Sequence, residues 1–107
     1  MEIHLFVKED GESPFELWLS ELRDVTARGR VLARINRVRL GNFGDAKSLG
    51  QGLHELRLDV GPGYRVYFGR KGREVVVLLC GGNKASQEKD IALARNYWRA
   101  FKEHSDE

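Results

Sequence analysis

Residues 53–84 constrain the fold most, because they predict three consecutive strands separated by two glycine-containing turns. The expected strands are residues 53–60, 64–70 and 74–80. Strands joined by turns this short pair antiparallel. The segment therefore predicts a meander sheet, and the rest of the chain has to supply the helices that cover it.

Alternation of apolar and polar residues divides the predicted sheet into two faces. Leu56 and Val66 fall on one face, whereas Arg57, Arg65 and Tyr67 fall on the other. An antiparallel sheet commonly buries one face and leaves the other to water. We therefore expect the face that carries the two arginines and the phenol to be open to a ligand.

The lengths of the turns predict how these side chains face one another across the strands. A three-residue turn at 61–63 would place Arg65 opposite Asp59 and Arg57 opposite Tyr67. Continuing the alternation beyond the third strand places Lys84 on the same side. The sequence thus predicts that Arg57, Arg65, Tyr67 and Lys84 converge from three strands.

The N-terminal part predicts one strand at residues 3–8 and then two helices. Ser13 can cap the first helix, with proline at its first position and Glu16 completing a capping box. The second helix is expected over residues 26–40, with an apolar stripe on one side and arginines on the other. These arginines are Arg30, Arg34 and Arg37.

Two interpretations of this basic stripe stay open at the level of sequence. It is a solvated face of an amphipathic helix, or it is a surface that binds RNA phosphates or an acidic partner. The formal net charge is only +2, from 18 Lys+Arg against 16 Asp+Glu. Binding to nucleic acid would therefore depend on local clustering of cations rather than on the overall charge.

The order of elements predicts an α+β fold. Residues 45–52 are expected to form a loop, and a last helix is expected to begin with Ser86 as its cap. The order is then β-α-α-β-β-β-α, which predicts a small antiparallel sheet with the helices packed on one face. The length of 107 residues fits a single domain over residues 1–107.

The single cysteine and the N-terminus bear on localisation. Cys80 lies in an apolar run and is expected to be buried, and one thiol cannot form an internal disulfide. The first residues lack the pattern of a signal peptide, and no apolar stretch approaches the roughly 20 residues that span a bilayer. We therefore expect a cytoplasmic protein with no membrane partner.

The predicted cluster suits phosphoryl transfer within RNA. In this reaction a ribose 2′-hydroxyl attacks the neighbouring phosphate, and cations stabilise the charge that develops. Arg57 and Arg65 offer planar guanidinium groups to phosphate oxygens. Tyr67 could stack on a base, or act as acid or base if the cations depress its pKa. The alternative is that Arg65 and Asp59 form an ordinary surface ion pair.

His54 is the other candidate for acid–base chemistry, although it shares the alternation of the core residue Leu56. It would reach the cluster only if the start of its strand twists or bulges. The sequence contains no spacing typical of metal ligands and no nucleotide-binding loop. We therefore expect neither a metal nor a cofactor.

Two motifs, GLHELRLDVGPGYRVYF and VVLLCGGNKASQEKDIALARNYW, resemble the RelE/ParE toxin superfamily. The nearest resemblance is to the phage-related addiction module killer proteins, a branch close to HigB-type toxins. The resemblance implies the same order of elements and a toxin of a type II toxin–antitoxin system. It implies an mRNA endoribonuclease (an mRNA interferase) that works on the ribosome without metal, inhibits translation, and is blocked by a small DNA-binding antitoxin from the adjacent gene.

The resemblance also suggests roles for individual residues. Arg65 matches the arginine of the central strand, Arg57 a basic position on the preceding strand, and Lys84 a basic residue after the last strand. The family's C-terminal tyrosine or histidine has no counterpart, since Tyr97 falls inside the last helix, so the general acid stays open. Two alternatives remain: a ParE-like inhibitor that binds DNA gyrase, and a non-toxic binding module derived from a phage.

Overall fold

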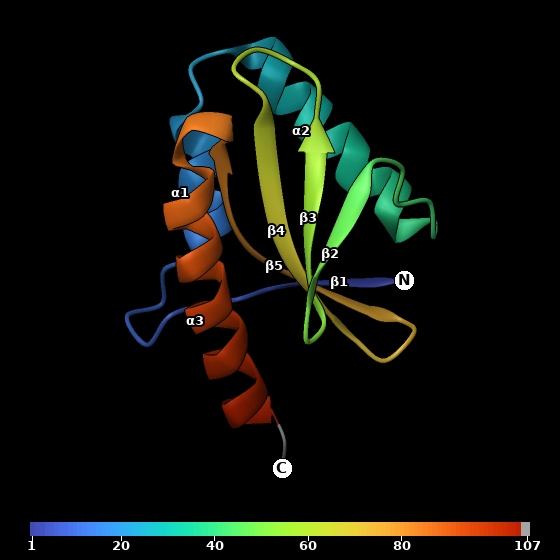
Figure 1. Ribbon diagram of the computed structural model, residues 1–107, viewed down its shortest axis with the longest axis vertical. Coiled ribbons are helices and arrows are strands. Elements are labelled where there is room, and N and C mark those ends of the chain that lie inside the picture. The colour runs from blue at the N-terminus through green and yellow to red at the C-terminus, as the bar shows by residue number, and fades with distance from the viewer. Residues whose placement is uncertain (106–107) are drawn as a thin grey trace.

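The computed structural model describes residues 1–105, so the last two residues of the predicted domain lie outside the described part. Over these described residues the fold is α+β, with a five-stranded mixed sheet and three α-helices (Figure 1). The elements in chain order are β1 (Glu2–Leu5), α1 (Pro14–Glu21), α2 (Val25–Arg39), β2 (Ala46–Gly50), β3 (Leu53–Leu58), β4 (Tyr64–Lys71), β5 (Val75–Asn83), the 3₁₀ turn η1 (Lys84–Ser86) and α3 (Gln87–Ser105).

The strands lie in the order β1-β5-β4-β3-β2. The predicted meander of three antiparallel strands is confirmed, but the sheet differs from the prediction at both edges. β1 pairs parallel with β5, so the sheet is mixed. β2 occupies the segment that was predicted to be a loop and pairs antiparallel with β3. The short β2 alternates poorly, which explains why its sequence does not predict a strand.

The helices cover both faces of the sheet, so the prediction that they pack on one face is wrong. In Figure 1, α2 and α3 lie on opposite sides of the strands. Helices α1 and α2 pack on one face, with the buried residues Phe15, Val31, Ile35, Val38, Leu56, Leu58, Val66, Phe68, Val76 and Leu78. Helix α3 packs on the other, with Phe6, Leu53, Tyr67, Val77, Leu79, Cys80, Ala94 and Trp98.

Close packing of α3 on the sheet depends on a glycine in β4. A Cβ atom at Gly69 would overlap the ring of Trp98 from α3, so only glycine allows this approach. Nearby, a bulge in the β4–β5 pairing leaves Leu79 without a register partner and turns it toward the same core as Cys80. Cys80 is buried as predicted, and burial raises the pKa of its thiol to about 12.

The helix starts agree with the sequence in part. The Ser13 hydroxyl accepts a hydrogen bond from the backbone N–H of Glu16, as expected for the cap of α1. At the other end of the chain, Asn83 rather than Ser86 is the capping residue. Its side-chain oxygen accepts hydrogen bonds from the backbone N–H groups of Ala85 and Ser86, and the Ser86 side chain completes the capping box. Helix α3 then continues directly from η1, which fixes its first turn against the end of β5.

Candidate functional site

The two central arginines lie opposite each other on neighbouring strands. In the β3–β4 pairing Arg57 faces Arg65, and Leu58 faces Tyr64. The predicted register, with Arg57 opposite Tyr67, is wrong by two residues, because the connection spans residues 59–63 and not three residues. The difference brings the two guanidinium-bearing positions closer together than predicted, since directly opposed Cβ atoms lie only about 5 Å apart.

Lys84 joins these arginines at one end of the sheet. A hollow of about 300 Å³ is lined by Asp45, Arg57, Leu58, Asp59, Gly63, Arg65 and Lys84, and we call it the strand hollow. The Arg57 side chain is 36% exposed, and Arg65 is half-buried. The predicted convergence of Arg57, Arg65 and Lys84 is therefore present, and the cations remain accessible to a ligand.

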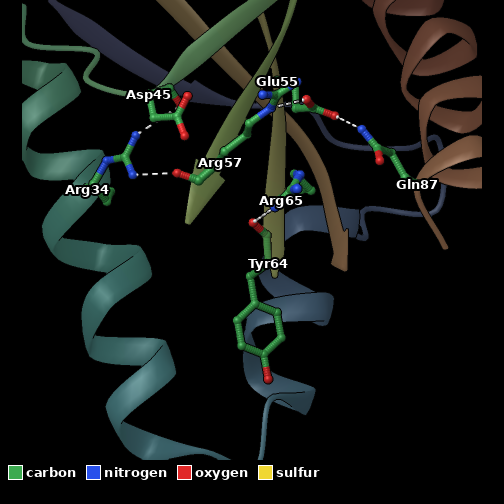
Figure 2. A network of polar contacts seen from close by, with 7 residues as sticks. All are labelled: Arg34, Asp45, Glu55, Arg57, Tyr64, Arg65 and Gln87. Carbon is green, nitrogen blue, oxygen red and sulfur yellow. Dashed lines mark hydrogen bonds and ion pairs between the residues drawn. The ribbon is translucent and has the colours of Figure 1, made fainter. Parts of the chain in front are cut away.

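A buried glutamate holds Arg57 in place. Glu55 is completely buried, yet one of its carboxylate oxygens accepts a 2.9 Å bond from Arg57 Nε and the other a 2.6 Å bond from Gln87 Nε2 of α3. Figure 2 shows this carboxylate lying between the Arg57 and Gln87 side chains. The hydrogen bond and the charge of Glu55 raise the pKa of Arg57, so the guanidinium stays charged.

Tyr67 does not lie on an open face. It is fully buried under α3, and its hydroxyl has no hydrogen-bond partner among the described residues. Burial raises the pKa of Tyr67, and the charges of Glu55 and Asp90 act in the same direction, whereas Arg65 opposes them only weakly. The prediction of an accessible phenol with a depressed pKa is therefore wrong. The cause is α3, which covers the face that sequence alternation left open.

Arg34 is half-buried and has a structural role, unlike an exposed arginine of a solvated helix face. Its guanidinium donates hydrogen bonds to the backbone carbonyls of Arg57 (2.6 Å), Phe43 (3.1 Å) and Asp45 (3.3 Å), as Figure 2 shows in part. Burial lowers the pKa of Arg34, and the neighbouring charge of Arg37 lowers it further. Arg34 thus ties α2 to β3 directly at the residue that carries the Arg57 side chain.

The other two arginines of the predicted stripe stay exposed on α2. A second hollow, of about 470 Å³, lies between α2 and the β3–β4 connection, and we call it the helix hollow. It is lined by Thr26, Gly29, Arg30, Ala33, Arg34, Arg37, Leu58, Asp59 and Val60. The two hollows share Leu58 and Asp59, so the basic side chains of α2 and of the sheet line adjacent surfaces.

His54 belongs to neither hollow. It lies on the α2 face of the sheet, where its ring stacks on Phe68 with a centroid distance of 5.2 Å. Burial lowers the pKa of His54, and the charge of Arg70 lowers it further. Since Arg57 and Arg65 point to the other face, His54 does not contact the strand hollow in this arrangement.

Sequence reasoning missed the buried partners of the cations. Glu55 and Arg57 are two residues apart on one strand, and this spacing was the only signal that they share a face. Neither the burial of Glu55 nor its contact with Gln87 can be predicted from the sequence, because both depend on where α3 packs. Over residues 1–105, no group of three His, Cys, Asp or Glu side chains could hold a metal ion. Nor does any helix in that range have the length and apolar character needed to cross a membrane.

The chain is similar to a known bacterial protein. No protein-family model matches the chain. An uncharacterized protein of Haemophilus influenzae (strain ATCC 51907 / DSM 11121 / KW20 / Rd) is 49% identical over 81 residues, which cover 76% of this chain and 82% of the relative. Its name assigns no activity.

Proposed function

We propose a function for this chain, which belongs to the same family as the uncharacterized Haemophilus influenzae protein. In this proposal it is the toxin of a type II toxin–antitoxin system and cleaves mRNA. The observation that carries the proposal is the pair Arg57 and Arg65, opposed across two strands with Lys84 beside them in one accessible hollow. The motifs that resemble the RelE/ParE superfamily, in its HigB-like branch, support it further. The order of elements is compatible with it, since β-α-α-β-β-β-β-α contains the order that the resemblance implies, with β2 in addition.

The strand hollow suits a scissile phosphate. In the proposed reaction the ribose 2′-oxygen attacks phosphorus, the bond from phosphorus to the 5′-oxygen breaks, and a cyclic phosphate and a 5′-hydroxyl result. Negative charge on the phosphate oxygens is greatest at the transition state. Arg57 and Arg65 oppose each other across the β3–β4 pairing, where Arg57 is held by Glu55 and Arg65 donates a 3.1 Å hydrogen bond to the backbone carbonyl of Tyr64. In the proposed reaction these placed donors stabilise the developing charge.

Proton transfer falls to groups that line the hollow. Tyr67 is buried and His54 lies on the opposite face, so neither reaches the phosphate. The remaining ionisable groups of the strand hollow are Asp45, Asp59 and Lys84. In the proposed scheme a carboxylate accepts the proton of the 2′-hydroxyl, and the Lys84 ammonium donates a proton to the departing 5′-oxygen.

The helix hollow provides a path for the neighbouring nucleotides. Arg30 and Arg37 are exposed there, and the hollow adjoins the strand hollow at Leu58 and Asp59. Phosphates on one side of the cleaved bond therefore meet a second set of cations. With a net charge of only +2, the affinity for RNA arises from these two local surfaces. The proposed partners are mRNA on the ribosome and a small antitoxin.

Induction of the chain in a bacterial host tests the proposal. We expect growth arrest, relief by co-expression of the adjacent gene product, and new 5′ ends in translated messages by primer extension. Arg65→Ala should restore growth while the melting temperature of the purified protein stays close to wild type. Arrest without new RNA ends, together with inhibition of gyrase supercoiling, would instead identify a gyrase inhibitor. The absence of arrest would identify a non-toxic binding module.

A further inference from the structure

We propose that Glu55 is a positioning residue that acts through Arg57, an inference that rests on the proposed function. Glu55 does not contact the strand hollow itself, since its side chain is completely buried. It touches the hollow only through the 2.9 Å bond that Arg57 Nε donates to it. The contact by which Glu55 acts on a ligand in the hollow is therefore this hydrogen bond, which sets the orientation of the Arg57 guanidinium.

The burial of a carboxylate at this position requires a reason. Removing an ionised carboxylate from water is costly unless hydrogen bonds and an opposite charge compensate it. Glu55 has both, because Arg57 supplies the charge and Gln87 supplies a second donor. An apolar residue would fill the same space between β3 and α3 without that cost. A buried acid is suited to this place because it orients the arginine beside it.

The atom that bonds to Glu55 decides what Arg57 can do. Nε is the donor nearest the chain, so the bond fixes the rotation of the guanidinium plane and leaves the two terminal nitrogens outside this contact. An arginine without such a partner samples many rotamers and loses that freedom only when the ligand binds. With Nε held, the terminal edge is already oriented toward the hollow before RNA arrives.

The second bond of Glu55 links this orientation to the docking of α3. Gln87 is the first residue of α3, and its side-chain amide donates the 2.6 Å bond to Glu55. The start of the helix, the buried carboxylate and Arg57 thus form one connected unit (Figure 2). The hollow acquires its geometry when α3 packs against the sheet.

A double-mutant cycle on RNA cleavage tests the inference. Glu55→Gln keeps the shape of the side chain but removes its charge, and Arg57→Lys keeps the cation but removes Nε. We expect Glu55→Gln to lower the cleavage rate constant at saturating RNA by about tenfold to a hundredfold, with little change in KM. In the Arg57→Lys background the same change should have almost no further effect. The matched control is Glu88→Gln, which neutralises an exposed acid next to Gln87 in the first turn of α3. It should leave cleavage unchanged.

A second readout does not depend on activity. In the wild type the Nε–H proton of Arg57 should exchange slowly with water in NMR spectra, and Glu55→Gln should accelerate this exchange. If the wild type cleaves RNA but Glu55→Gln cleaves equally well, or loses the same factor with Arg57→Lys present, the positioning role is overturned and the function stands. If the wild type does not cleave RNA although the Arg57 proton is protected, the proposed function fails and the inference fails with it.

Discussion

The helix hollow and the strand hollow adjoin each other and each contains three cations, but their cations are held differently. In the helix hollow, Arg34 uses its donors on backbone carbonyls, and Arg30 and Arg37 extend into solvent from α2. In the strand hollow, Arg57 and Arg65 are cross-strand neighbours, and a buried carboxylate fixes Arg57. Flexible exposed cations attract a polyanion, whereas fixed ones stabilise a transition state. In the proposed function, the first surface therefore suits binding of RNA and the second suits the chemical step.

Substitution of Arg34 should destabilise the protein far more than substitution of its neighbours on α2. Arg34→Met removes the donor for three backbone carbonyls, and we expect it to lower the free energy of unfolding by about 2 kcal/mol. Arg30→Met, on the same helix and exposed, should change it by less than about 0.5 kcal/mol. Urea unfolding measures both. Equal losses in the two variants would remove the structural distinction between these arginines.

Two glycines next to the hollows allow a matched test of packing. Gly82 of β5 faces Arg65, and a Cβ there would overlap the Asp90 carboxylate of α3, so Gly82→Ala should cost about 1–2 kcal/mol. Gly29 of α2 has open space around it, and Gly29→Ala should stabilise the protein by about 0.5–1 kcal/mol. Thermal unfolding compares them. Stabilisation by Gly82→Ala would mean that α3 does not dock closely at the strand hollow.

The salt dependence of RNA binding tests whether RNA phosphates contact the arginines of the helix hollow. Arg37→Ala should reduce the slope of log K against log salt by about 0.7, the value for one phosphate contact on a single strand. Titrations of a labelled RNA oligonucleotide at several salt concentrations give this slope. An unchanged slope would show that RNA does not pass over α2.

His54 lies outside both hollows, and its substitution should change only the pH dependence of stability. Its pKa is lowered in the folded state, so the unfolded chain binds more protons below about pH 6.5. The stability that neutral His54 contributes is present above the unfolded pKa and is lost as the pH falls through the folded one. His54→Gln should therefore reduce the fall in stability between pH 7.5 and pH 5. An unchanged fall in stability in His54→Gln would contradict this expectation.

The sequence predicted the central strands but not what covers them. Alternation through β3 and β4 correctly separated Leu56 and Val66 from Arg57 and Arg65. The predicted β3–β4 register was wrong because the glycine turn at residues 61–63 can be part of a connection of either three or five residues, and the sequence does not distinguish the two. The position of α3 could not be predicted, since an apolar stripe on a helix does not specify which face of a sheet it meets.

The candidate site was predictable as a set of cations and not as a set of contacts. Alternation within β3 and β4 correctly predicted that Arg57 and Arg65 share a face, whereas Lys84 reaches them from η1, beyond a bulge in the β4–β5 pairing that alternation does not reveal. The burial of Tyr67 and Glu55 follows from α3, and so it was hidden in the sequence. The three bonds of Arg34 go to backbone carbonyls, which every residue carries, so no residue type signals them. Long-range packing, rather than local pattern, decides which cations are held and which are exposed.

The most direct test compares one arginine from each hollow in single-turnover cleavage of the same ribosome-bound message. We predict that Arg65→Ala lowers the cleavage rate constant by about a hundredfold or more, since it removes a donor that lies opposite Arg57 at the developing charge. Arg30→Ala should mainly raise the concentration needed for half-saturation. Cleavage by Arg65→Ala at the wild-type rate, or equal losses in the rate constant for both variants, would contradict the assignment of chemistry to the strand hollow.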